Sequence, residues 1–300
     1  MIISVVNHSN RKVKDKDLQT VIRAINRQIT EDFAPYWSMS ATLRLEGRSM
    51  NEPDKVGVAD MRGDAILYIW DKSDVDGALG YHFANNRGIP YGFVFLDVAE
   101  AVGESWTVTL SHEALELLAD PEGNLLVIGP HPSADQNRFV FHWFEMCDAV
   151  QADTYTIDGV EVSNFVLPLY FTGSRDEDEP GARNDFLGTV KEDDQTTLPS
   201  FGINKGGYVG FYDPLINDHV QFTLENDAAA RSRVDAKKAI KVARRTLRIR
   251  DEQVRTGVMA NRNAAMLRIR GAAAPAEQEA SVVPASPRAT TRRRVSRIEP

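Results

Sequence analysis

Short apolar runs and segments with helical periodicity alternate along the first 120 residues, and this order constrains the fold more than any other feature of the chain. Residues 2–6 are apolar and mostly β-branched, which predicts a buried strand. Apolar side chains then recur at helical spacing after Asp15, which can cap a helix, and Pro35 predicts that this helix ends near Phe33. Further strands are expected at 42–45, 64–71 and 91–96, the second of them central, and residues 77–88 carry loop signals.

A second helix is expected from about Ser105 to Ala119, because Asp120-Pro121 stops it. The order strand, helix, three strands, helix predicts an α+β fold with a mixed sheet beside the second helix. A β-hairpin-rich region is expected to follow, with strands at 139–144, within 154–171 around a turn at Asp158-Gly159, and at 208–212 and 219–222.

The last third of the sequence changes in composition. Residues 172–206 are polar and acidic, which is typical of a long loop. Residues 227–270 are rich in Ala and Arg with one apolar helical face, and the remainder is rich in Ala, Pro, Ser and Arg. We therefore expect a domain at 1–225, a basic helical extension at 226–270 and a disordered basic tail at 271–300.

The basic and acidic residues are unevenly distributed between the expected domain and the C-terminal part of the chain. The chain has 35 basic and 43 acidic residues, of which residues 229–300 hold 18 and 6, so that an acidic body precedes a basic tail. Such a tail can bind nucleic acid or an acidic protein surface, including a neighbouring subunit of an assembly. The alternatives are a tail that pairs with its own body and one that only aids solubility.

Compartment follows from three observations. Cys147 is the single cysteine, so an intrachain disulfide is excluded, and a reducing setting fits. The longest apolar runs fall short of the ~20 residues of a membrane helix, and no charged leader precedes residues 2–6. We expect neither a signal peptide nor a transmembrane segment, no membrane partner, and a cytoplasmic or virion-associated protein.

The expected second helix carries a pattern that indicates metal chemistry. His112 and Glu116 are four residues apart, so both project from one face and can reach one ion. Glu113 is rotated by ~100° from His112 and can stand beside the ion without binding it. This is the spacing of the zinc-peptidase motif His-Glu-x-x-His, with a carboxylate in place of the second histidine. We therefore expect zinc or another divalent metal, with Glu113 as general base.

A catalytic zinc site needs a third protein ligand. We expect Glu145 in this role, since it follows an aromatic strand and can return to the helix from a distance in sequence. Asp148 is the second choice. Asp120 lies two helical turns from His112, roughly 12 Å along the axis, too far for the same ion on a regular helix. A carboxylate that does not bind the ion could instead orient His112.

Chance is the alternative explanation of these three residues, because a solvent-facing helix often carries His and Glu. The residues around them argue against it. Apolar side chains surround the polar triplet, so the helix should be largely buried, and buried charges are costly unless they are paired or metal-bound.

The chain resembles known proteins both in the order of its elements and in three of its segments. The order of elements through residue 120 resembles the zincin metallopeptidases, which implies that residues 91–96 form the edge strand beside the active-site helix. More narrowly, the segment SHEALELLADP at 111–121, with 145–150 and 155–166, looks like motifs of uncharacterised phage and bacterial proteins over residues 1–225. Glu116 departs from the zincin pattern, which implies weaker zinc binding, a different divalent ion, or a site that has lost catalysis.

Other polar residues have ordinary explanations. His82 and His142 could be additional ligands or substrate contacts, but a satisfied or exposed histidine is more common. Cys147 is expected to be a small buried hydrophobe. Tyr155 could donate to an oxyanion, as tyrosines do in some zincins, or simply belong to a hairpin strand.

The sequence thus supports two hypotheses of different kinds. The first is a metal-dependent hydrolase, most naturally a peptidase acting on a peptide or protein. The second is a non-catalytic structural or virion protein that reuses a zincin fold and binds nucleic acid or an acidic partner through its basic tail.

Overall fold

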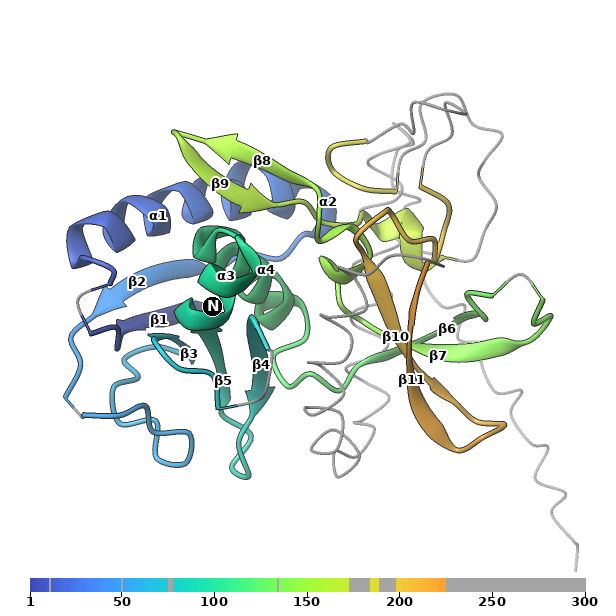
Figure 1. Ribbon diagram of the computed structural model, residues 1–300. Helices are drawn as coiled ribbons and strands as arrows, with labels where there is room; N and C mark the ends of the chain where they lie inside the picture. The colour runs from blue at the N-terminus through green and yellow to red at the C-terminus, as the bar shows by residue number, and fades with distance from the viewer. Residues whose placement is uncertain are drawn as a thin grey trace, which may run out of the picture.

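The computed structural model describes residues 1–10, 12–49, 51–74, 78–133, 135–172, 184–188 and 198–224. The expected helical extension at 226–270, the expected tail at 271–300 and most of the expected loop at 172–206 lie outside these residues. The described part has the mixed α+β class that the sequence predicts, with several sheets and few helices (Figure 1).

The first sheet has five strands in the order β2-β1-β3-β5-β4. β2, β1, β3 and β5 run parallel, and β4 pairs antiparallel with β5. β3 is central, as its continuous run of apolar residues predicts. The strands are β1 (Ile2–Asn7), β2 (Thr42–Glu46), β3 (Ala65–Trp70), β4 (Gly80–Ala84) and β5 (Pro90–Phe95).

Two expectations about this sheet are wrong. The segment at 91–96 was expected at the edge, but β5 lies between β3 and β4. The edge position belongs to β4, which occupies part of the segment that its glycines and paired asparagines mark as a loop. Pairing with β5, in which His82 lies opposite Gly92, overrides those local signals.

Alternating side chains give the sheet two different faces. Val5, Leu67 and Val94 point into the larger hydrophobic core, on the side of the helices. Tyr68 and Phe93 point to the other side, into a smaller, aromatic-rich core. A strand residue's position in this alternation therefore decides whether it meets a helix.

The helices cover the face of the larger core (Figure 1). Asp15 is the first residue of α1 and not its cap, because the cap residue is Lys14. The helical path also continues beyond the expected end at Phe33, since Pro35 falls in the first turn of α2, where its missing N–H costs nothing. The elements are α1 (Asp15–Arg27), a π-helix (Gln28–Phe33), α2 (Ala34–Trp37), α3 (Leu96–Val102) and α4 (Trp106–Ala119).

Helix α4 is the element that the sequence predicts most closely. Ser105 caps it, with its hydroxyl accepting from the Thr107 N–H at 3.4 Å. The helix ends at Ala119, before Asp120-Pro121. Every residue from Val108 to Ala119 is buried, because α4 packs between the first sheet and the β8–β9 hairpin.

A second sheet, in the order β11-β10-β7-β6, lies to one side of the first (Figure 1). The expected strands at 139–144, 208–212 and 219–222 are present in it, whereas β6 is not predicted, because Gly129 and Pro130 are typical of a turn. The remaining elements are β6 (Leu126–Pro130), β7 (Phe139–Trp143), β8 (Thr154–Ile157), β9 (Val160–Ser163), β10 (Tyr208–Asp213), β11 (Asp218–Thr223) and 3₁₀ turns at Asp148–Val150 and Pro168–Phe171.

The β8–β9 hairpin turns at Asp158-Gly159, as expected, but the chain from Pro168 to Phe171 forms a 3₁₀ turn where a strand was expected. Within the described part of the chain, no helix is long and apolar enough to cross a membrane.

Candidate metal centre

Helix α4 places charged side chains inside the protein. His112, Glu113 and Glu116 expose 7%, 3% and 1% of their surfaces. Their neighbours on the helix are apolar and anchor it in the larger core. Burial of three ionisable groups on one helix is unfavourable unless other charges or an ion compensate for it.

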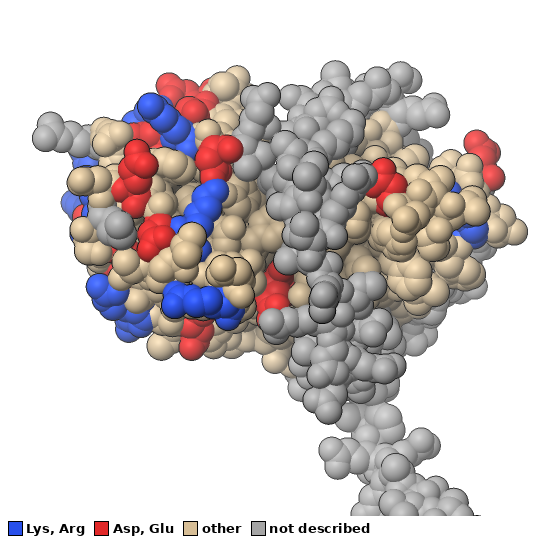
Figure 2. Space-filling view, turned by 90° about the horizontal axis from the view of Figure 1, so that it is seen from below, with Lys and Arg blue, Asp and Glu red and all other residues tan. Residues whose placement is uncertain are grey.

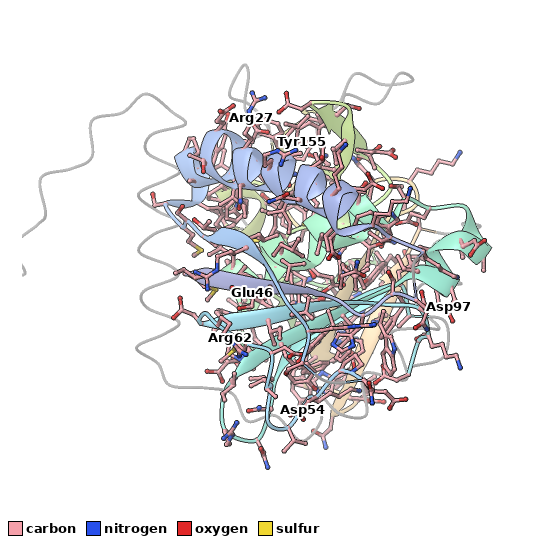
Figure 3. All side chains as sticks on the ribbon, turned by 90° about the vertical axis from the view of Figure 1, so that its left-hand side faces the viewer. Arg27, Glu46, Asp54, Arg62, Asp97 and Tyr155 are labelled. Carbon is pink, nitrogen blue, oxygen red and sulfur yellow. The ribbon has the colours of Figure 1, made fainter. Side chains whose placement is uncertain are left out.

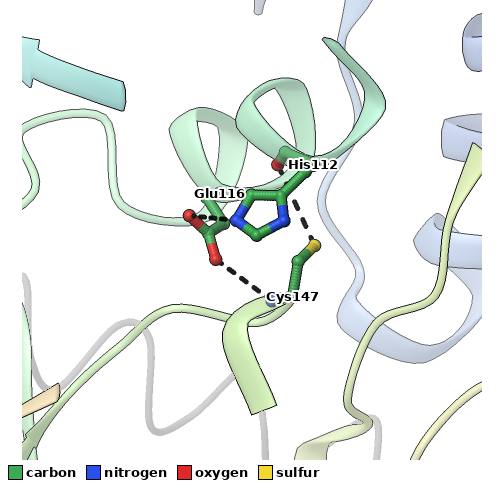
Figure 4. Close-up of side chains that lie close together, drawn as sticks. All are labelled: His112, Glu116 and Cys147. Carbon is green, nitrogen blue, oxygen red and sulfur yellow. Dashed lines mark hydrogen bonds and ion pairs between the residues drawn. The ribbon is translucent and has the colours of Figure 1, made fainter. Parts of the chain in front are cut away.

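His112 faces two carboxylates that come from different parts of the chain. Its Nε2 lies 3.2 Å from Glu116 Oε2, one turn along α4, and 3.3 Å from Asp148 Oδ1, in the 3₁₀ turn after β7. Neither contact has the geometry of a hydrogen bond, so Nε2 is a buried polar atom without a hydrogen-bond partner. Figure 4 shows the His112 ring directed at the Glu116 carboxylate.

These separations fit donors arranged around an ion. Zinc ligands at 2.0–2.2 Å on the corners of a tetrahedron lie roughly 3.3–3.6 Å from one another. Charge-assisted N–H···O hydrogen bonds are shorter, about 2.7–2.9 Å. The contacts of 3.2 and 3.3 Å match the first spacing better than the second. The donor set, one imidazole and two carboxylates, suits zinc or another divalent ion.

Two hydrogen bonds hold the carboxylates in place. Tyr208 on β10 donates its hydroxyl to Asp148 Oδ1 at 2.6 Å. The backbone N–H of Cys147 donates to Glu116 Oε1 at 3.1 Å, which leaves Oε2 directed at His112 (Figure 4). Burial raises the pKa of the Cys147 thiol, so this side chain is an uncharged thiol beside the centre.

Glu145 completes a group of acidic side chains. Its carboxylate, with those of Glu116 and Asp148, offers oxygens that all lie within 4.8 Å of one another. A cavity of about 10 Å³ beside Glu145 and Asp148 has room for about one water molecule. Glu145 is thus near the centre, but the structure places Asp148, the second choice of the sequence analysis, in direct contact with His112.

Glu113 projects from α4 in a different direction from His112, toward β4. Its Oε2 is 3.2 Å from His82 Nδ1, and the same nitrogen is 3.9 Å from Glu116 Oε2. His82 Nε2 lies 3.1 Å from the carbonyl oxygen of Asp120. His82 therefore links Glu113 to the end of α4, and Glu113 stands beside the His112–Glu116 pair without contacting His112.

Carboxylic side chains outnumber histidines in the cluster. Glu113, Glu116, Glu145 and Asp148 are buried together with His82 and His112, so four ionised carboxylates would exceed two protonated imidazoles by two negative charges. Burial by itself lowers the pKa of His112, but Glu116 and Asp148 outweigh it and raise that pKa well above its ordinary value. A divalent ion would neutralise the excess.

Two further candidates from the sequence are used elsewhere. The Tyr155 hydroxyl donates to Asp32 at 2.7 Å and accepts from Gln28 at 3.2 Å, and Figure 3 shows Tyr155 beside α1. Asp120 ends α4, where its Oδ2 accepts from the Leu125 N–H at 2.7 Å, and burial raises its pKa to about 6. Asp120 is not among the carboxylates beside His112 Nε2, which are those of Glu116 and Asp148, as its position two turns along the helix predicts.

His82 and Tyr208 are the residues that sequence reasoning did not assign to the centre. His82 is buried and satisfied, as the ordinary explanation expects, but its partners are the motif residue Glu113 and the helix end. The signal was present in the alternation Tyr81-His82-Phe83, which places His82 on the opposite face from two aromatic side chains. Tyr208 offered no comparable signal.

Comparison of the chain with protein-family models, with curated proteins and with solved structures finds no match.

Proposed function

We propose that the protein is a divalent-metal-dependent hydrolase, with zinc as the expected ion, held by His112, Glu116 and Asp148. The observation that carries the proposal is the buried His112 Nε2, which lies 3.2 and 3.3 Å from two carboxylate oxygens without hydrogen-bond geometry. A bound ion would supply Lewis acidity and lower the pKa of a water molecule to about 7. Glu145 would serve as an alternative or additional acidic ligand.

Each protein group then has a distinct task. Glu113 accepts the proton of the attacking water and passes it to the leaving group. His82 holds the Glu113 carboxylate at 3.2 Å and is itself anchored on the Asp120 carbonyl. Tyr208 fixes Asp148, and the Cys147 N–H fixes Glu116, so the ligands are oriented before an ion binds.

Peptides are the substrate class that the surrounding fold supports best. β4 is one of the two edge strands of the first sheet and carries His82, so this sheet edge lies beside the cluster. Extended peptides can add to a sheet edge as a further strand. A parallel sheet with one antiparallel edge strand next to a His-Glu-x-x-Glu helix also supports the zincin-like interpretation of the fold.

The test is a peptide-library digestion with the full chain, before and after removal of metal. We expect cleavage that is lost on chelation and restored by zinc. Glu113→Gln should reduce cleavage by about 10²–10⁴-fold while the zinc at His112 is retained, because it removes the base and not a ligand. A Glu113→Gln variant with undiminished cleavage would refute the assigned mechanism.

A second function, that of a metal-stabilised structural protein, is favoured by one observation. The ligands are buried, and the cavity of about 10 Å³ admits no substrate without movement of the chain. The second-sheet lobe also exposes large apolar residues, and Figure 2 shows few charges on its visible face. These residues, suited to an assembly contact, are Ile128, Phe139, Leu215 and Ile216.

The two functions differ in what the basic residues at 229–300 should do. In the structural protein they would bind nucleic acid or an acidic protein surface. Deletion of this segment should leave the cleavage rate of a hydrolase unchanged, whereas an assembly protein should lose its partner. Binding to nucleic acid should weaken steeply as salt rises.

A further inference from the structure

A second set of donor atoms surrounds Glu113. It consists of His82 Nδ1 from β4 and carboxylate oxygens of Glu113 and Glu116 from α4, all within 4.8 Å of one another. His82 Nδ1 lies 3.2 Å from Glu113 Oε2 and 3.9 Å from Glu116 Oε2. Glu116 Oε2 is therefore shared, since it also lies 3.2 Å from His112 Nε2 in the first set.

The His82 ring has the orientation of a metal ligand. Its Nε2 lies 3.1 Å from the Asp120 carbonyl oxygen, which only accepts hydrogen bonds, so Nε2 carries a hydrogen. Histidines that bind metals commonly donate their second ring N–H to a backbone carbonyl in this way. With Nε2–H as one donor, Nδ1 faces two carboxylate oxygens. Two occupants fit between Nδ1 and these oxygens: a proton, in the hydrogen bond of 3.2 Å to Glu113 Oε2, or a cation that all three side chains bind.

The Glu113 carboxylate also lies close to β4. A Cβ at Gly80 would lie 2.9 Å from Glu113 Oε1, so the glycine allows the carboxylate to approach β4. Thr109, one turn before Glu113 on α4, is 5% exposed, and its Oγ1 has no hydrogen-bond partner. A buried hydroxyl without a partner can bind a water molecule.

We propose that His82, Glu113 and Glu116 form a second divalent-cation site and that Glu116 bridges the two ions. Sites of two ions about 3.5–4 Å apart are common in hydrolases. A second ion uses Glu113 as a ligand and so removes it as a base, which makes the site inhibitory at high metal concentration. This last consequence rests on the proposed function, whereas the cation site itself does not.

A proton shared by His82 and Glu113 is the competing occupant, and metal stoichiometry separates the two. Metal is first removed from the full chain with a chelator, and the chain is then titrated with zinc alone. Native mass spectrometry measures the number of zinc ions bound at each step, and elemental mass spectrometry measures the total zinc. We expect two successive binding steps and about two zinc ions per chain at saturation.

The variants assign the two steps. His82→Gln and Glu113→Gln should each weaken the second step by at least about tenfold and leave the first unchanged. His112→Gln should weaken the first step. The control is His142→Gln, because His142 is also buried and also contacts a backbone carbonyl through Nε2, that of Pro130 at 2.8 Å, but belongs to neither donor set. It should retain both steps.

Each other result overturns the proposal in a recognisable way. One zinc ion that is lost in His112→Gln and retained in His82→Gln would refute the second site and leave the proposed function standing. Two ions retained in His82→Gln would also refute the second site. An absence of bound zinc in the wild-type chain would refute both this inference and the metal-dependent hydrolase.

Discussion

Replacement of Asp148 by asparagine should have opposite effects on the metal-free and the zinc-loaded protein. In the metal-free protein, Asp148 attracts a protonated His112 at 3.3 Å by about 5 kcal/mol at an effective dielectric constant of ~20. Glu116 and Glu145, whose oxygens lie within 4.8 Å, each repel it by at least about 3 kcal/mol. Removal of the charge should therefore stabilise the metal-free protein by roughly 2 kcal/mol.

With zinc bound, the wild type should instead be more stable than Asp148→Asn. An ion present at about 1,000 times its dissociation constant stabilises the native state by about 4 kcal/mol. For a domain of this size, that corresponds to a rise of roughly 8–16 °C in the unfolding temperature. Asp148→Asn loses a ligand and should gain little from zinc, although its Oδ1 can still accept from Tyr208.

The assay is thermal unfolding of both proteins with chelator and with saturating zinc. Asp60→Asn is the matched control, because Asp60 is buried and lies 3.3 Å from His8 Nε2, the distance that separates Asp148 from His112, but outside any acidic group. It should destabilise the protein equally in both conditions. Equal destabilisation by Asp148→Asn would refute the reasoning and make Asp148 an ordinary ion-pair partner of His112.

Two further predictions concern the fold around the centre. Burial lowers the pKa of His142 to about 4, below the unfolded value of about 6.5, so stability present at pH 7 should be lost as pH falls from 6.5 to 4, by up to about 3 kcal/mol. His142→Phe should abolish that part of the acid sensitivity in urea unfolding, and an unchanged pH profile would contradict it. Ser105→Ala should cost about 1 kcal/mol in the same assay, because it removes the cap of α4, and a neutral result would show that packing alone sets the start of the helix.

Local sequence signals predicted the motif helix but not its partners in the sheet. Ser105, the apolar periodicity and Pro121 are all local, so the start and the end of α4 follow from neighbouring residues. β4 is different, because Gly80 belongs to a segment with loop composition and becomes a strand only through its pairing with β5. Because the sequence does not predict β4, it places residues 91–96 at the sheet edge, which is wrong.

The candidate site divides in the same way. The spacing of His112 and Glu116 is a property of one helix and was readable from the sequence. The choice between Glu145 and Asp148 depends on how the chain turns after β7, which no local pattern specifies. The role of His82 depends on the register of an edge strand against α4, so it required the tertiary structure.

The proposed hydrolase depends most directly on zinc bound at His112. The deciding measurement is the zinc content of the full chain, purified without chelator or affinity metal, compared with that of Glu116→Ala. We predict a tightly held ion in stoichiometric amount that survives gel filtration in the wild type and is lost in the variant. A wild-type chain that retains no zinc, even after incubation with excess zinc, would contradict the metal-dependent function.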